Sequence, residues 1–65
     1  MSTNEPQVAD MGRYDTQRTC RELGISRSTL ERYRRKGFIR VHFFKTNYRP
    51  FYYGHDILKL WRLSL

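Results

Sequence analysis

The segment from Ser26 to Gly37 restricts the possible folds most strongly, because it carries the start and stop signals of one short helix. The Ser26 hydroxyl can cap the first turn by accepting one of its unpaired amides. Gly37 suits the left-handed residue that follows a helix C-terminus. With Leu30 turned inward, Tyr33 lies beside it on a narrow apolar edge. The sequence therefore predicts a helix that meets the core along this edge.

The opposite side of this helix is cationic. Ser28, Arg32 and Arg35 fall on the face away from Leu30. A solvated surface helix without any binding role has the same pattern. The segments on either side of the helix must therefore decide between these two interpretations.

A second short helix is expected just before it, from about Thr16 to Leu23, with Asp15 as its cap. Its inner stripe has i, i+4, i+7 spacing and consists of Thr16, Cys20 and Leu23. Gly24 ends this helix, and Ile25 then points into the core. Two short helices joined by a glycine turn predict a helix-turn-helix.

After Gly37 the pattern changes to that of strands. Residues 38–44 alternate with period two, and their apolar members are Ile39, Val41 and Phe43. Residues 45–48 form a polar break, and residues 49–53 return as a second strand. Pro50 confines that second strand to a sheet edge or to a strand start. The sequence predicts a β-hairpin with a basic tip.

A last helix is expected to open at Gly54 or His55, with Ile57, Leu60 and Trp61 facing the core. The whole then forms a small α+β fold of the winged helix-turn-helix type: helix-turn-helix, a two-stranded β-hairpin wing and a C-terminal helix. Residues 1–12 are polar and aperiodic, so they are predicted to be a disordered tail, with the domain spanning residues 13–65. The expected core consists of Thr16, Cys20, Leu23, Ile25, Leu30, Tyr33, Ile39, Val41, Phe43, Tyr52, Ile57 and Trp61.

Charge indicates the class of partner. The net charge is +7 over 65 residues. Residues 1–15 hold one arginine and three carboxylates, whereas residues 16–65 hold twelve Lys or Arg and only three carboxylates. Arginine forks match phosphate oxygens and guanine edges, so nucleic acid is the first expectation and a membrane surface the second. No apolar run approaches the roughly 20 residues of a spanning helix, and no export signal is present. We therefore expect a cytoplasmic protein.

Other chemistries find little support. A single cysteine, Cys20, excludes an intrachain disulfide. Cys20, His42 and His55 are the only cysteine and histidine residues, and their spacing along the chain does not match that of metal ligands, so no metal site is expected. Neither histidine is expected to have a site role. Paired carboxylates, a glycine-rich phosphate loop and a nucleophile–base set are all missing. We expect no cofactor and no enzymatic activity.

Residues 23–39, from Leu-Gly-Ile through Ser-Arg-Ser-Thr-Leu-Glu-Arg-Tyr-Arg-Arg-Lys-Gly-Phe-Ile, resemble the MerR-type DNA-binding domain and its small relatives, the phage and conjugative-element excisionases. The resemblance extends from Tyr14 to about Leu63. One departure is Glu31, where MerR regulators often carry arginine. Another is that their coiled-coil and effector-binding part is missing from these residues. The resemblance implies a recombination directionality factor, which binds and bends DNA at attachment sites and assists an integrase in excision.

The second helix is then expected to enter the major groove of double-stranded DNA. Ser28 and Arg32 are the candidates for base contacts, and Arg27 and Arg35 flank them. Glu31 either pairs with Arg35 or accepts from a cytosine amine. The wing candidates for the adjacent minor groove or backbone are Lys45, Asn47 and Arg49.

Three alternatives remain open. The same fold serves small prophage-type transcription regulators, whose target is a promoter. It also resembles the DNA-binding domain of a terminase small subunit. A basic module that binds an acidic protein is the third alternative. Leu58 and Leu65 have no obvious inward direction. Together with Leu63, they are apolar residues near the chain end that exceed what one small core absorbs, so all three are predicted to contact an integrase or a second copy during cooperative assembly on DNA.

Overall fold

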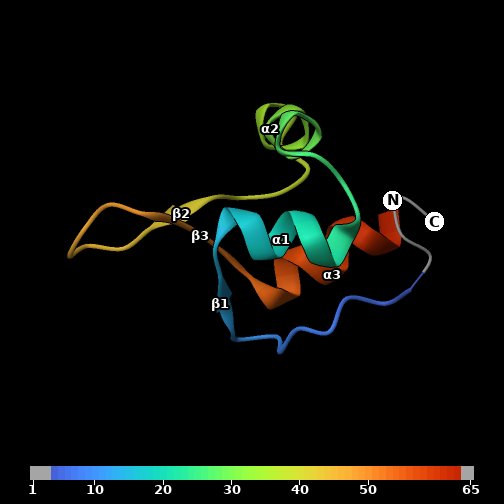
Figure 1. Ribbon diagram of the computed structural model, residues 1–65, viewed down its shortest axis with the longest axis horizontal. Helices are drawn as coiled ribbons and strands as arrows, with labels where there is room; N and C mark the ends of the chain where they lie inside the picture. Colours follow the sequence, from blue (N-terminus) through green and yellow to red (C-terminus); the bar gives the residue numbers. More distant parts are fainter. Residues whose placement is uncertain (1–3, 64–65) are drawn as a thin grey trace.

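Three helices and a small antiparallel sheet make up the part of the chain that the structure describes, residues 4–63 of a computed structural model (Figure 1). The chain order is β1, α1, α2, β2, β3, α3. The bounds of these elements are β1 Arg13–Tyr14, α1 Thr16–Leu23, α2 Arg27–Arg35, β2 His42–Phe43, β3 Pro50–Tyr53 and α3 Gly54–Leu63. The predicted α+β class is confirmed, and all three expected helices are present.

Both helices of the predicted helix-turn-helix begin at the expected caps. The Asp15 side chain accepts from the Arg18 amide at 2.7 Å, and the Ser26 hydroxyl accepts from the Thr29 amide at 3.2 Å. Each cap satisfies one of the unpaired amides in the first helical turn. The short sequence signals at Asp15 and Ser26 therefore placed both helix starts correctly.

The two helices also end in the same way, on a glycine in the left-handed region. At α1, Gly24 has φ +69°, and the amide of Ile25 reaches back to the Cys20 carbonyl at 3.0 Å. At α2, Gly37 has φ +79°, and the Phe38 amide reaches the Tyr33 carbonyl at 2.9 Å. This pattern is the Schellman motif.

That second motif corrects the predicted first strand. Residues 38–44 were expected to be a strand, but only β2, His42–Phe43, forms a ladder. The Phe38 amide is already used to close the end of α2, and the Phe38 ring packs against Tyr33 with centroids 6.0 Å apart. The chain therefore cannot enter the sheet until it has turned away from the helix.

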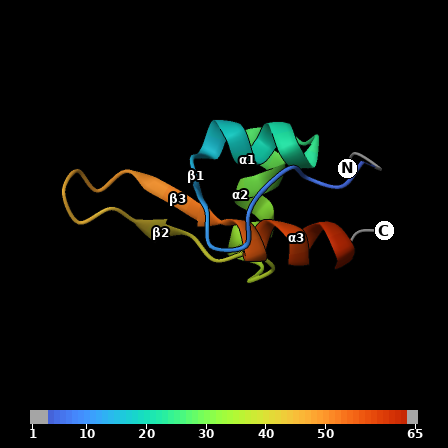
Figure 2. The same cartoon turned by 90° about the horizontal axis from the view of Figure 1, so that it is seen from below.

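The sheet has the order β1-β3-β2, so β3 lies in the centre. Pro50 is its first residue, as predicted. Because proline has no backbone N–H, this position keeps the missing donor out of the interior of the strand. Strand β1 was not predicted; Arg13 lies opposite Tyr53, and Tyr14 opposite Tyr52. Figures 1 and 2 both show the β2–β3 hairpin projecting beyond the helices.

The core follows the prediction except at Thr16, Thr19, Phe43, Leu58 and Phe51, the last of which is buried although the expected core lacked it. Its buried members are Cys20, Leu23, Leu30, Ile39, Tyr52, Ile57 and Leu60, with Ile25, Tyr33, Val41 and Trp61 packed against them in part. Thr16 is only half-buried, and Thr19 is buried instead. Phe43 is 57% exposed, so its assignment to the core was wrong. Leu58, expected on the surface, is 8% exposed, so no free contact surface exists there.

Leu63 and Leu65 were also expected on the surface. Leu63 is exposed, as expected, and Leu65 lies outside the described residues.

Burial raises the pKa of the Cys20 thiol, which keeps it protonated, as in a structural cysteine.

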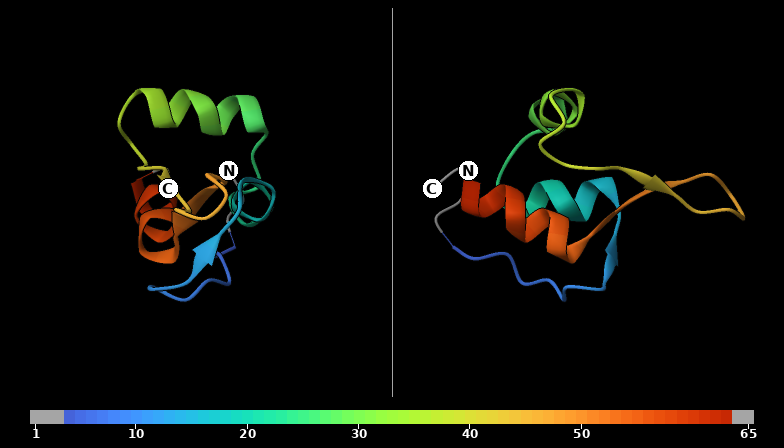
Figure 3. Two further views of the ribbon diagram at one scale, coloured as in Figure 1. Left: turned by 90° about the vertical axis from the view of Figure 1, so that its left-hand side faces the viewer. Right: turned by 180° about the vertical axis from the view of Figure 1, so that it is seen from behind.

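Residues 4–12 lie against the rest of the fold on the side away from α2 (Figures 1 and 3). Its carbonyls cap α3: the Gly54 amide donates to Gly12 at 2.9 Å, and the His55 amide to Asp10 at 2.9 Å. A side chain at Gly54 would place its Cβ 1.7 Å from the Ala9 oxygen. The predicted disorder of residues 1–12 stays a prediction, but these contacts join residues on both sides of the predicted boundary.

Candidate nucleic-acid interface

Helix α2 presents a cationic face to the outside of the molecule. Figure 3 shows α2 crossing over the layer that contains α1 and α3. Leu30, only 1% exposed, is the one side chain of α2 that is buried, and it holds the helix to the core. Ser28, Arg32 and Arg35 are exposed, as the helical wheel predicted, and Arg27 is exposed as well.

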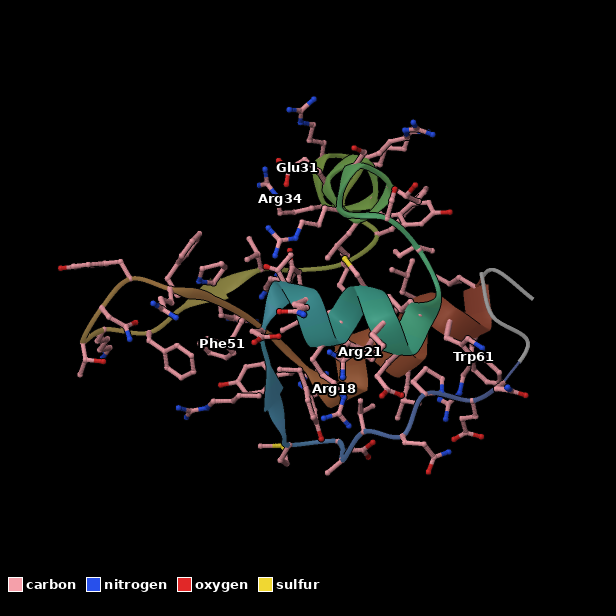
Figure 4. The ribbon with its side chains drawn as sticks, in the orientation of Figure 1. Arg18, Arg21, Glu31, Arg34, Phe51 and Trp61 are labelled. Atoms are coloured by element: carbon pink, nitrogen blue, oxygen red, sulfur yellow. The ribbon has the colours of Figure 1, made fainter. Side chains whose placement is uncertain are left out.

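The carboxylate on this helix selects a partner that the sequence analysis missed. Glu31 accepts two hydrogen bonds from Arg34, one of them from Arg34 Nε at 3.1 Å (Figure 4). The Nε atom of Arg35 lies further away, 3.7 Å from Glu31 Oε1. The Arg34 hydrogen bonds lower the pKa of Glu31 below its ordinary value. Arg34 lies one helical turn from Glu31, at the i, i+3 spacing at which side chains meet. That spacing was visible in the sequence.

The pairing leaves most of the positive charge of α2 available. Arg35 is the more distant partner, and its side chain is 75% exposed. Within residues 4–63, no carboxylate forms an ion pair with Arg27 or Arg32. These guanidinium groups therefore have their hydrogen-bond donors free for an external anion.

A groove of about 540 Å³ separates α2 from the hairpin. Arg27, Ser28, Glu31 and Arg34 form its α2 wall, and Val41, Phe43, Pro50 and Tyr52 form the wall opposite. Phe43 is exposed because it points into this groove rather than into the core. The groove makes the α2–hairpin side of the molecule concave, with the cationic side chains of Arg27 and Arg34 along its α2 edge.

The hairpin tip carries the predicted wing residues. Lys45, Asn47 and Arg49 are all exposed. Asn47 also has an internal role, because its side-chain oxygen accepts from the Arg49 amide at 3.0 Å. This bond shapes the turn in the way that asparagine commonly does. Tyr48, which the sequence analysis did not select, is 78% exposed beside them.

The predicted residues form two groups rather than one cluster. Arg27 of α2 and Arg49 of the hairpin line the same hollow, which also borders the start of α1. Ser28 and Glu31 line the groove, whereas Arg32 and Arg35 lie outside it. The helix and the hairpin therefore offer a divided cationic surface with Arg27 and Arg49 between its halves.

One arginine outside this surface, Arg18, is more fully engaged. Arg18 of α1 pairs with Glu22 at 2.9 Å and donates to the Gln7 carbonyl at 3.2 Å. Glu22 in turn accepts from the Gln7 amide at 2.8 Å, and this bond is the main reason that the pKa of Glu22 is lowered. Here the charges hold the fold together.

Both histidines lie beside Asp56. His42 Nε2 is 3.9 Å and His55 Nδ1 is 3.3 Å from a carboxylate oxygen of that residue. Among residues 4–63, no group of three or more histidine, cysteine or acidic side chains is arranged to hold a metal ion. Nor does any helix in that range have the length and apolarity needed to cross a membrane.

Searches of known protein families, curated proteins and solved structures find no match to this chain. Its function must be argued from the geometry of α2 and the hairpin.

Proposed function

We propose that this protein is a winged helix-turn-helix protein that binds DNA sequence-specifically and bends it. One observation carries the proposal: a capped helix, held by a single buried leucine, presents its arginines beside a protruding basic hairpin. Among residues 4–63, Arg27 and Arg32 have no ion-pair partner, and Arg35 lies only at the edge of the Glu31 pair. A linear array of phosphates is the partner that best satisfies such a divided cationic surface.

In the proposed complex, the outer face of α2 enters the major groove. A helix fits this groove, and arginine can donate two hydrogen bonds to guanine there. Arg32 and Ser28 lie furthest from Leu30 around the helix and would meet base edges first. Arg27 and Arg35 would reach phosphates on either side.

The hairpin would contact the same duplex at the next minor groove or along its backbone. Lys45 and Arg49 supply the charge, and Asn47 fixes the turn on which they stand. The concave groove between α2 and the hairpin would then receive the DNA backbone that separates the two grooves. Contacts on both sides of one backbone strand favour a bent duplex.

The finer proposal is that this DNA-binding protein acts as an excisionase, assisting an integrase in the excision of a phage or mobile element. Its support is the resemblance of residues 23–39 to that group, together with the basic hairpin that projects beyond the helices. A promoter-binding regulator has the same contacts and differs in where on the genome it binds.

The direct test is selection of duplexes from a random library by the purified protein, followed by titration and bending assays on the selected site. The expected result is a recurrent sequence, bound far more tightly than a scrambled duplex, with a linear fall of log affinity against log salt concentration. Enrichment of no sequence would contradict sequence-specific recognition. Genomic footprints at integrase attachment sites would support an excisionase, and footprints at promoters a regulator.

A further inference from the structure

Tyr48 stands at the outer end of the hairpin, in the turn that joins β2 to β3. Figures 1 and 2 show this turn to be the part of the hairpin furthest from the helices. The Tyr48 side chain is 78% exposed, the highest exposure among the large hydrophobic residues of the described chain. Its ring stacks on no other aromatic ring within that range. The fold therefore does not use this ring for packing.

The backbone at Tyr48 is also unusual. Its φ is +57°, and no other residue except glycine has a positive φ in the described chain. The left-handed region is unfavourable for a bulky side chain, and glycine would adopt it without strain. The Tyr48 amide donates to the Phe44 carbonyl at 2.8 Å, so the turn holds this conformation firmly. Stability of the turn alone does not explain an aromatic residue here, and strain of this kind often marks a functional position.

Aromatic contacts hold together the part of the hairpin below the tip. Phe44 and Phe51 pack with ring centroids 4.5 Å apart, and the Arg13 guanidinium lies 5.4 Å from the Phe51 ring centre. His42 stacks on Phe51 from the neighbouring strand at 5.4 Å. This aromatic cluster lies between the tip and α3, so the Tyr48 ring is held at a distance from the body rather than left on a loose loop.

The charges around the tip favour a polyanion. Residues 40–50 contain Arg40, Lys45 and Arg49 and no acidic residue. Lys45 precedes Tyr48 in the sequence of the turn and Arg49 follows it, and both are exposed. An apolar ring flanked by two cations suits the minor groove, where phosphates line both edges and the stacked bases form the floor.

We propose that Tyr48 is a wedge, whose ring enters the minor groove and partly unstacks one base step, so that the DNA bends at that point. The inference rests on the proposed DNA-binding function and adds a residue and a mechanism for the bend. Pyrimidine–purine steps such as TA unstack most easily, so the wedge would favour sites with such a step beneath the hairpin. Lys45 and Arg49 would hold the phosphates on the two sides of the opened step.

The test compares Tyr48→Gly with Tyr48→Phe on the selected duplex, carrying 2-aminopurine at a TA step within the hairpin's footprint. With wild-type protein, we expect increased 2-aminopurine fluorescence and a bend in a circular-permutation assay. Tyr48→Phe should preserve both, because the ring remains. Tyr48→Gly should lose the fluorescence increase and most of the bend, with affinity reduced roughly tenfold or more. Its thermal unfolding midpoint should equal or exceed that of wild type, because glycine relieves the strained φ.

The possible failures can be told apart. If the wild type binds no duplex even at low salt, the proposed function and the wedge both fail. If Tyr48→Gly binds, bends and unstacks like wild type, the wedge is wrong and the DNA-binding function stands. If the substitution weakens binding and leaves the bend unchanged, Tyr48 is a contact residue only, and the wedge is again overturned.

Discussion

Helices α1 and α2 begin and end alike, yet α1 lies within the fold and α2 lies at its edge. Each starts at a side-chain cap, Asp15 or Ser26, and each is followed by a glycine in the left-handed region. Helix α1 buries three residues, Thr19, Cys20 and Leu23, whereas α2 buries only Leu30. The same local construction therefore supports two different tertiary roles.

The arginines of the two helices differ accordingly. Arg18 of α1 is held by Glu22, by the Gln7 carbonyl and by the Tyr14 ring, whose centre is 5.3 Å from its guanidinium carbon. On α2, Arg32 has no such partner in the described chain, and Arg35 lies at the edge of the Glu31 pair. Position in the fold, rather than residue type, distinguishes an arginine that stabilises from one that is available to bind.

The largest expected effect concerns the anchors of the two helices. Leu23→Ala and Leu30→Ala should each reduce the free energy of unfolding by about 2–5 kcal/mol, because each removes a fully buried side chain. Urea denaturation measures the loss. Amide exchange should show that Leu30→Ala exposes α2 more than α1. Equal loss of amide-exchange protection in both helices would contradict the inference that Leu30 alone holds α2 to the core.

The next effect distinguishes an arginine that is proposed to contact base edges from one that is proposed to contact the DNA backbone. Arg32→Ala should reduce the preference for the selected site over a scrambled duplex by about 1–3 kcal/mol. Arg49→Ala should weaken both duplexes by similar factors and make the log–log salt slope shallower by about one. Titration at several salt concentrations measures both quantities.

Arg21→Ala supplies the matched control, since Arg21 is an exposed arginine on α1. It should change site preference little, and its unfolding free energy should stay within about 0.5 kcal/mol of wild type. Equal losses on both duplexes for Arg32→Ala would remove α2 from the reading role and require another element in the major groove.

Substitutions at the two capping residues test whether the caps of α1 and α2 contribute equally to the free energy of unfolding. Asp15→Ala and Ser26→Ala should each cost about 1 kcal/mol, as the loss of a capping side chain usually does. Ser26→Ala should in addition weaken DNA binding, because it loosens the first turn of the proposed reading helix, whereas Asp15→Ala should not. Thermal denaturation and duplex titration of the two variants give the comparison.

The smallest effect is on the pH dependence of stability. Glu22 on α1 has a pKa lowered from 4.5, first by the Gln7 amide and then by Arg18. A carboxyl group whose pKa is lower in the folded state stabilises above its unfolded pKa and loses that contribution as pH falls through the folded pKa. Glu22→Gln should therefore flatten the acid limb of the stability curve below about pH 4.5. Glu31→Gln, which affects only an exposed pair on α2, should flatten it less.

Most local features of the fold were predictable from short stretches of sequence. The caps, the two left-handed glycines and the strand start at Pro50 all depend on hydrogen bonds or steric limits within a few residues. The helical wheel of α2 also placed Leu30 inside and Ser28, Arg32 and Arg35 outside. Each of these signals is complete within its own segment.

Other features escaped because they depend on distant partners. Strand β1 is two residues long and exists only because β3 lies beside it. Phe43 and Leu58 were placed on the wrong sides because periodicity does not show which neighbour covers a side chain. The α3 caps at Asp10 and Gly12 come from a segment with no pattern of its own.

The sequence by itself determined where the helices start and stop and which face of α2 is cationic, since nearest neighbours along the chain decide both. The tertiary structure alone decided that Arg18 is held by a distant segment while Arg32 has no ion-pair partner among the described residues, and that Tyr48 lies at the end of a projecting hairpin. The physical reason is range: hydrogen bonds at a cap join residues three or four apart, whereas burial and ion pairing across the fold depend on which distant segments the core brings together.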